Sequence, residues 1–302
     1  MQKIGIPKGL LYYRYHILWK AFFDCLDVPY ITSEESNLEI LKKGQAKSVD
    51  EACLALKIYL GHIESLKDKC DSILIPRIYS LEKGYQACTN FNCLYDLVKN
   101  IYPNFNIINY NIDVSHHESE KKGFFKIGKE LGFNLITINH AYKLAKEVEK
   151  NYHDKLVAQG QKKLKSNKLK ILLVGHHYNL EDALIGKRIS SYLRKENIEL
   201  LYSYEVPQEA IDKYSYQIST KIHWTMNKEL LAAFAYFKDQ VDGVIILTAF
   251  PCGPDSLANE MMIRKKGNSK VLLLTFEDLS SDTAIITRLE SFIDMIKGGI
   301  HL

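Results

Sequence analysis

The residues with the clearest capacity for chemistry are six cysteines, and the most distinctive of them is Cys252. It follows the apolar run 244–249, which predicts a buried strand, and it lies between Pro251 and Pro254. The prolines end the strand, and Asp255 or Ser256 is suited to cap the helix that follows. The Cys252 thiol is therefore expected between a strand end and a helix start, where open α/β sheets bind ligands and thiolates are stabilised. The alternative is a rigid turn that contains an inert buried cysteine.

The other five cysteines are Cys25, Cys53, Cys70, Cys88 and Cys93. The chain has no Cys-x-x-Cys pair, so neither a zinc ribbon nor a thioredoxin-type redox site is predicted. The N-terminal residues lack a signal-peptide pattern, and we expect a cytoplasmic chain without a disulfide framework. Any metal site would have to be assembled from distant segments. Cys25 is expected on the apolar face of a helix and Cys70 in a packing role ahead of a strand.

Composition excludes several classes of function. The net charge is +4, with lysines scattered among glutamates, which argues against a nucleic-acid partner. No apolar run approaches the roughly 20 residues that span a bilayer. Neither Gly-x-Gly-x-x-Gly nor Gly-x-x-x-x-Gly-Lys-Ser/Thr occurs, so the chain alone is not expected to hydrolyse ATP.

Strands alternate with helices along the chain, which predicts two Rossmann-like α/β domains with parallel sheets and a cleft between them. The hydrophilic stretch near residue 165 places the domains at 1–165 and 166–302. The expected strands cover 3–7, 28–32, 72–78, 106–112, 170–174, 198–204, 244–249 and 270–275. The expected helices cover 10–26, 49–63, 94–101, 124–132, 140–165, 224–237 and 283–296, and one more begins near Glu181 or Asp182. Arg288 and Glu290 are expected to pair on the last helix.

Several blocks of sequence occur together. They are Ile4-Gly5-Ile6-Pro7 with Trp19-Lys20-Ala21-Phe22-Phe23, Cys53 followed by Gly61-His62, Ile75-Pro76-Arg77 leading to Cys88, Gly175-His176-x-Tyr178-Asn179, Phe250-x-Cys252-Gly253-Pro254-Asp255-Ser256, and Thr287-Arg288-Leu289-Glu290-Ser291-Phe292-Ile293-Asp294. In these blocks the chain resembles the 2-hydroxyacyl-CoA dehydratase component family, in the branch associated with acyl-CoA dehydratase activases and double-cubane-cluster proteins. The resemblance covers nearly the whole chain, and the last two blocks are the most specific.

The resemblance implies that three cysteines, Cys53, Cys88 and Cys252, hold an iron–sulfur cluster, either [4Fe-4S] or double-cubane. Three thiolates leave one iron of a cubane open to another ligand. Three further residues are expected near the cluster as groups that orient substrate or support the ligands: His62, Tyr178 and Asn179. Each of these could instead bond only to nearby backbone.

The sequence also departs from the family pattern. Lys8-Gly9, Leu54, Thr89 and His177 stand where the family usually has other residues. Cys93 is an extra thiol close to Cys88 and is an alternative middle ligand. These departures argue more strongly against dehydratase activity of this chain alone than against cluster binding.

The leading hypothesis is an oxygen-sensitive iron–sulfur protein for low-potential electron transfer or reductive chemistry on acyl-CoA-type substrates. It would act as a dehydratase-like lyase or as a component of an iron–sulfur reductase. The implied partners are a homologous chain, in a homodimer or heterodimer, and an ATP-dependent activase or another reductant protein. The alternatives are a non-catalytic cluster-carrying partner of the activase, a double-cubane-type reductase of small molecules, and a cluster-free α/β binding protein.

Overall fold

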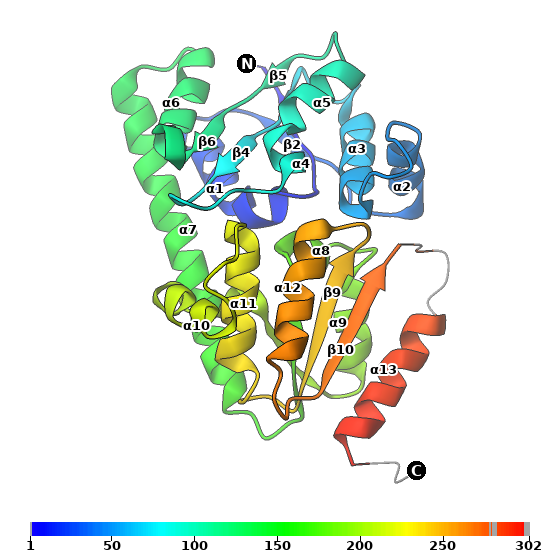
Figure 1. The fold of residues 1–302 in the computed structure, drawn as a ribbon. Coiled ribbons are helices and arrows are strands. Elements are labelled where there is room, and N and C mark those ends of the chain that lie inside the picture. Colours follow the sequence, from blue (N-terminus) through cyan, green and yellow to red (C-terminus); the bar gives the residue numbers. More distant parts are fainter. Residues whose placement is uncertain (1, 278, 280–282, 299–302) are drawn as a thin grey trace. The chain divides into compact units, whose positions relative to one another are not determined.

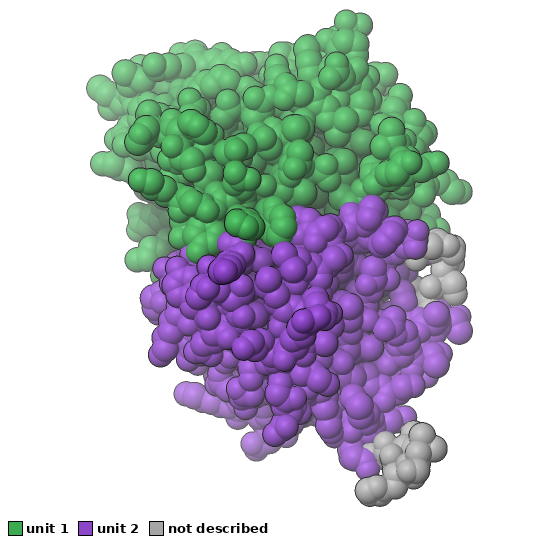
Figure 2. Space-filling model, viewed as in Figure 1, with its two compact units in different colours: residues 1–155, 223–225 green, residues 156–222, 226–302 purple. Residues whose placement is uncertain are grey.

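The computed structural model describes residues 2–277, 279 and 283–298, which form two compact units (Figure 2). Unit 1 contains the residues up to Lys155 together with His223–Thr225, and unit 2 contains 156–222 and the residues from Met226 onward. The division falls within the long helix α7 (Leu135–Leu164), whereas the sequence-based boundary lies just after the end of this helix.

Unit 1 contains a parallel sheet in the order β2-β1-β3-β5 and a smaller parallel pair, β4-β6 (Figure 1). Its elements before α7 are β1 (Ile4–Ile6), α1 (Tyr12–Cys25), β2 (Tyr30–Thr32), α2 (Leu38–Gln45), α3 (Leu54–Leu66), β3 (Ser72–Leu74), β4 (Arg77–Ser80), α4 (Thr89–Asn92), α5 (Leu94–Ile101), β5 (Ile107–Ile108), β6 (Asn111–Asp113), η1 (Val114–His116) and α6 (Glu120–Glu130). The strand β1 is fully buried and pairs with both β2 and β3, so it is the centre of the larger sheet.

Two predicted strands of unit 1 are each divided between the two sheets. Residues 72–78 form β3 and β4 rather than one strand, and Pro76 lies between them. Proline has no N–H to donate to a strand ladder, which explains the break. Residues 106–112 likewise form β5 and β6, separated by Asn109 and Tyr110. The Tyr110 hydroxyl accepts a hydrogen bond from Trp19 Nε1 (2.8 Å) in the core, which ties this break to α1.

The predicted helix 49–63 begins later than expected, at Leu54, and it packs on α2, a helix that the sequence did not predict. The two helices meet at Gly44 and Gly61. A Cβ on Gly44 would lie 1.6 Å from the carbonyl oxygen of Lys57, and one on Gly61 would lie 1.8 Å from that of Ile40. Only glycine allows this approach, which fixes α3 and therefore the position of His62 beside Gly61.

Unit 2 contains a parallel sheet in the order β10-β9-β7-β8. Its elements after α7 are β7 (Lys170–Val174), α8 (His177–Leu180), α9 (Gly186–Lys195), β8 (Glu199–Tyr202), η2 (Ser203–Glu205), η3 (Gln208–Ala210), α10 (Ile211–Ile218), α11 (Thr225–Phe237), β9 (Gly243–Ala249), α12 (Gly253–Arg264), β10 (Val271–Phe276) and α13 (Thr283–Ile296). The helices α11 and α12 cover one face of this sheet and α9 covers the other (Figure 1). A helix starting near Glu181 was predicted here; the chain instead forms α8 and then α9.

The α/β fold class with parallel sheets is confirmed in both units. Over the residues that the structure describes, no helix combines the length and apolar character of a membrane span.

Candidate functional site

The strand order of each unit identifies the edge where a ligand site is expected. In unit 2 the chain adds β8 on one side of β7 and then β9 and β10 on the other side, so the direction reverses between β7 and β9. Parallel sheets bind ligands outside the carboxyl ends of their strands at such a reversal. Here β7 is followed by His176 and β9 by Cys252, which places both residues at this edge of unit 2.

Cys252 is the N-cap residue of α12, the position that the sequence assigned to Asp255 or Ser256. Pro254 lies in the first turn, where proline is tolerated because that turn has no intrahelical N–H partner. The thiol does not cap the backbone. It donates a hydrogen bond to the carboxyl group of Asp255, three residues later. The prediction that Cys252 lies between a strand end and a helix start is confirmed, and the residue is partly exposed.

Asp255 is at the centre of a buried cluster, which we call the Asp255 network: His176, Asn227, Asp255 and the Cys252 thiol. His176 Nε2 lies 2.7 Å from Asp255 Oδ1, and Asn227 Nδ2 donates to the same oxygen at 2.8 Å. The Asp255 side chain is about as buried as a carboxyl group can be, with 1% of the residue exposed. Burial alone would raise its pKa, but His176, Asn227 and Cys252 together lower the pKa below its usual value. Asp255 is therefore held as a carboxylate.

Tyr178 and Asn179, two of the predicted site residues, lie in α8 next to this network. The Tyr178 ring stacks on the His176 ring, with centroids 5.0 Å apart and planes 21° apart. Asn179 is completely buried, and no described residue forms a hydrogen bond with either polar atom of its side-chain amide. Such a buried amide is uncommon in a native protein.

A cavity of about 180 Å³ opens beside Cys252 within unit 2. Its lining includes Phe250, Cys252, Ser256 and Glu260, and its polar wall contains Asn259, which donates to Thr248 Oγ1 at 2.7 Å. The Cys252 sulfur thus has open space on one side and a buried carboxylate on the other.

Two more predicted ligands, Cys53 and Cys88, belong to unit 1 and are also N-cap residues. Cys53 precedes α3 and Cys88 precedes the single turn α4. Asn90, two residues after Cys88, donates from Nδ2 to the Cys53 sulfur at 3.6 Å. This contact brings the chain around Cys88 next to Cys53. Both thiols are partly accessible.

His62, predicted beside the cluster, is fully buried in unit 1 and has serine partners on both sides. Ser33 Oγ lies 2.9 Å from Nδ1, and Ser36 Oγ lies 2.9 Å from Nε2. Burial, followed by the positive charge of Lys8, lowers the pKa of His62 from 6.5 to about 3. The ring is therefore neutral at physiological pH, and it holds the segment between β2 and α2 against α3.

The remaining cysteines have different surroundings. Cys25 is the last residue of α1 and is exposed, so its predicted place on the buried face is wrong; that face runs through Trp19, Phe22 and Phe23. Cys70 donates to the Leu66 carbonyl at 3.3 Å, and burial raises the pKa of its thiol. Cys93 is exposed at the junction of α4 and α5.

The predicted pair on the last helix is not formed. Arg288 Nη2 donates to the Leu273 carbonyl at 2.7 Å, and Glu290 accepts from the Tyr192 hydroxyl at 3.4 Å. Residues two positions apart project from different sides of a helix, which explains the separate partners.

The donor set suits a thiolate-bound metal centre, with its cysteines divided between the units. Cys53 and Cys252 precede helices of 13 and 12 residues, where the positive end of the helix dipole favours a thiolate, whereas the Asp255 carboxylate beside Cys252 favours the thiol. Among the described residues, no group of three or more His, Cys, Asp or Glu side chains is placed to hold a metal ion. Two of the proposed ligands lie in unit 1 and one in unit 2. Their convergence at one point stays a prediction.

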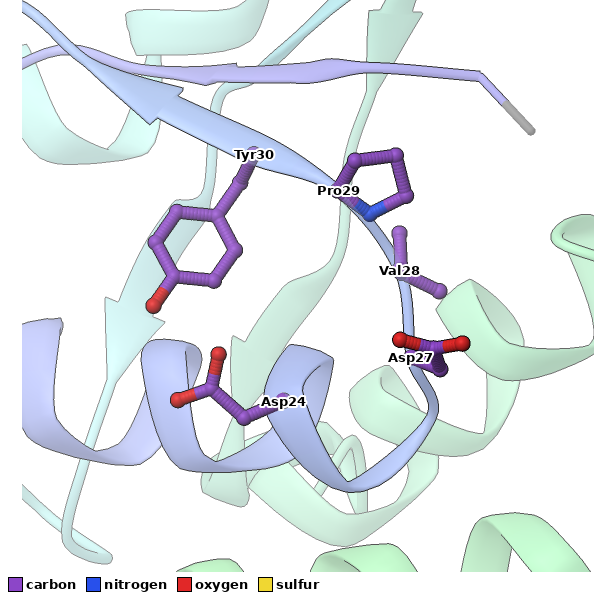
Figure 3. A pocket seen from close by; sticks show the side chains of 5 residues that line it. All are labelled: Asp24, Asp27, Val28, Pro29 and Tyr30. Carbon is purple, nitrogen blue, oxygen red and sulfur yellow. The ribbon is translucent and has the colours of Figure 1, made fainter.

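A larger cavity, of about 500 Å³, lies in unit 1 away from every predicted site residue (Figure 3). It is lined by Asp24, Asp27, Val28, Pro29 and Tyr30, between the end of α1 and the start of β2. The Tyr30 hydroxyl points toward the Asp24 carboxylate. Burial and a hydrogen bond from this hydroxyl to Asp24 raise the pKa of Tyr30 to about 12. This is the amino edge of the sheet, where parallel sheets do not place their ligand sites.

Sequence reasoning missed Asn90, which bonds to the Cys53 sulfur, and His176 and Asn227, which bond to Asp255. It also missed Ser33 and Ser36, the partners of His62. One signal was available for Asp255. Cys252-x-x-Asp255 has the N-cap-to-N3 spacing of a capping box, which places an acidic side chain at N3 close to the N-cap residue.

Comparison with solved structures finds weak similarities only. Three of the similar chains are ZnuA (10% identity, TM-score 0.28), the laminin-binding protein Lmb of Streptococcus agalactiae (11%, 0.29) and a Zn(II)-bound variant of AdcAII of Streptococcus pneumoniae (12%, 0.27). Each alignment covers 98% of both chains. With TM-scores below 0.5, these similarities carry no argument about function.

No curated protein sequence matches the chain. A family model does match, over residues 3–205, and its description is CoA enzyme activase uncharacterised domain (DUF2229). The match contains Cys53, Cys88 and His176 and ends before Cys252.

Proposed function

Because the chain belongs to the CoA enzyme activase uncharacterised domain family, we propose that it is an iron–sulfur component of an acyl-CoA enzyme system. In this proposal the chain works with an ATP-dependent activase or another reductant protein, and it pairs with a second copy or a homologous chain. Its cluster ligands are Cys53, Cys88 and Cys252.

The observation that carries the proposal is the shared position of these three cysteines. Each is the N-cap residue of a helix and each is partly exposed, and Cys93 shares the N-cap position at the start of α5. Iron binds the thiolate rather than the thiol, and the starts of the long helices α3 and α12 favour a thiolate at Cys53 and Cys252. By contrast, Cys25 ends a helix, and burial raises the pKa of the Cys70 thiol.

Other residues of the chain have supporting roles in this proposal. Asn90 orients the Cys53 sulfur, and His62 fixes the segment that packs on α3, the helix that begins after Cys53. Tyr178 stacks on His176 and so supports the network behind Cys252. The buried amide of Asn179 has hydrogen-bonding capacity left for a substrate. When bound, the cluster would supply low-potential electron transfer.

The test is iron and sulfide analysis of the anaerobically purified chain, together with its electron paramagnetic resonance spectrum. Replacing Cys53, Cys88 or Cys252 by alanine should remove most of the bound iron, because each substitution deletes one ligand. The matched controls Cys25→Ala and Cys70→Ala should retain it.

Substitution of Cys93 tests whether Cys88 is the second of the three ligands along the chain. If Cys93→Ala removes iron and Cys88→Ala does not, Cys93 replaces Cys88 in the ligand set. Iron that survives all three ligand substitutions would refute the proposed function.

A further inference from the structure

The cavity of about 180 Å³ in unit 2 lies between one face of the sheet and one face of α12. Thr248 on β9 and Thr275 on β10 both line it, and they are register partners, so their side chains lie next to each other on the same face of the sheet. Four lining residues of α12 have the spacing i, i+3, i+4 and i+7 of a single helix face: Ser256, Asn259, Glu260 and Ile263. Between a helix and a sheet, an apolar core is the usual filling.

The sheet face under this cavity changes from apolar to polar along the strands. On β9, the residues that precede Thr248 on this face are Val244 and Ile246, both of which are buried. On β10, Leu273 precedes Thr275 in the same way. The two threonines therefore lie at the carboxyl ends of their strands, which is the edge where parallel sheets bind ligands.

Thr248 and Asn259 present a hydrogen-bond donor and an acceptor side by side. Both residues are only 4% exposed, and Asn259 Nδ2 donates to Thr248 Oγ1 at 2.7 Å. Among the described residues, neither the hydroxyl hydrogen of Thr248 nor Asn259 Oδ1 has a hydrogen-bond partner. Most buried polar groups in native proteins are fully partnered, so these two indicate a partner that the chain does not supply.

We propose that this cavity binds a small neutral molecule that carries a carboxamide group. The carbonyl oxygen of an amide accepts a hydrogen bond and its N–H donates one, so a single amide can satisfy Thr248 and Asn259 together. A carboxylate can only accept, and it would face Asn259 Oδ1 and the Glu260 side chain in the same cavity. The donor and acceptor pattern therefore favours the neutral group.

The rest of the cavity limits the remainder of the molecule. Its apolar lining suits an attached hydrocarbon group and consists of Phe250, Ile263 and Leu273. A cavity of roughly 150 Å³ is enough for a benzene ring, so about 180 Å³ leaves room for a ring or a short branched chain. Such binding requires neither iron nor an acyl-CoA substrate, so it goes beyond the proposed function.

The test compares benzamide with acetophenone, which has the same shape and the same carbonyl group but no N–H. Dissociation constants are measured by NMR titration of the full chain. Benzamide should bind about tenfold more tightly, because acetophenone leaves the buried acceptor Asn259 Oδ1 without a donor. Asn259→Leu removes this acceptor and should reduce the ratio of the two affinities to about one. The matched control is Asn268→Leu, an exposed position between α12 and β10, which should keep the wild-type ratio.

The variant Ile263→Trp tests the location, because it fills the cavity from a half-buried position and should abolish the binding of both compounds. If benzamide shows no saturable binding to the wild-type chain, the cavity holds only water and the proposal is overturned. Equal affinities for the two compounds, or an unchanged ratio in Asn259→Leu, would also overturn it. If Asn259→Leu does not fold, the wild-type ratio and Ile263→Trp decide, and benzamide binding retained in Ile263→Trp refutes the site.

Discussion

The two units contain buried histidines that hold together segments far apart in sequence, and the two histidines have chemically different partners. In unit 1, His62 lies between the hydroxyl groups of Ser33 and Ser36, a set that we call the His62 network. In unit 2, His176 bonds to the Asp255 carboxylate. Hydroxyl groups can serve either ring nitrogen of a neutral imidazole, whereas a carboxylate adds a buried charge. The same residue type thus supports a neutral core in one unit and a charged one in the other.

The difference predicts different responses to acid. The pKa of His62 falls to about 3 on folding, so the unfolded chain binds a proton there at higher pH than the folded chain does. The stability of unit 1 is therefore complete above pH 6.5 and declines as the pH falls from 6.5 toward 3. The pKa of Asp255 is also lowered, but its reference value is 3.8, so its contribution is complete above pH 3.8 and is lost only below it.

The largest expected loss of stability follows from a substitution in the Asp255 network. Asp255→Ala removes the shared acceptor of His176 and Asn227 and leaves both buried groups without it. We expect a loss of about 4 kcal/mol in the stability of unit 2, because each buried polar group left without its partner costs about 1–3 kcal/mol. Hydrogen exchange at the amides of β9, the central buried strand, measures this loss.

The control is Asp242→Ala in the same unit. This carboxylate bonds to the backbone N–H of Lys170 at an exposed position, so its removal should cost less than about 1 kcal/mol. If the two substitutions cost unit 2 the same stability, the Asp255 network would stabilise it no more than an exposed hydrogen bond does. The proposed difference between the histidines of the two units would then be refuted.

The second-largest expected effect is the loss of stability that protonation of His62 causes in unit 1 at low pH. Between pH 7.5 and 4.5, the wild-type chain should lose about 3 kcal/mol more stability in unit 1 than His62→Gln does, because glutamine cannot be protonated in this range. Urea unfolding followed by tryptophan fluorescence measures it, since Trp19 and Trp224 both belong to unit 1.

The surface variant His116→Gln serves as the control and should retain the wild-type response, because 74% of the His116 side chain is exposed. A wild-type chain whose unit 1 is equally stable at both pH values would contradict the assignment of His62 as a neutral buried group.

Much of the fold could be predicted from local patterns. The bounds of α5, β7 and α13 agree with the predicted ranges, because the two helices have a helical apolar period and β7 is a continuous apolar run. The failures have physical causes that a single segment does not reveal. Residues 72–78 are mostly apolar, yet the chain divides at Pro76 between two sheets. The helix α2 packs closely on α3 at Gly44 and Gly61, a contact that local sequence does not reveal.

The site was predictable only in part, for a similar reason. The position of Cys252 between a strand and a helix follows from local sequence, and the structure agrees with it. The partners of the predicted residues do not follow from local sequence. His176 and Asp255 are 79 residues apart, and His62 is separated from Ser33 by 29 residues. The first contact arises because the parallel strands β7 and β9 bring their carboxyl ends together, and the second because α3 packs beside the segment that follows β2.

The smallest effect that we predict concerns one hydroxyl group of the His62 network. Ser33 Oγ accepts a hydrogen bond from the Lys8 backbone N–H at 2.8 Å and also bonds to His62 Nδ1. Ser33→Ala should therefore cost unit 1 about 2 kcal/mol, since it leaves two groups without this partner. The control, Ser65→Ala, removes a hydroxyl that donates only to the His62 backbone carbonyl, at 2.8 Å, and should cost less than about 1 kcal/mol. Both are measured by urea unfolding at pH 7.5. If Ser65→Ala costs as much as Ser33→Ala, the His62 ring gains little from its hydroxyl partners, and packing alone would hold the segment between β2 and α2.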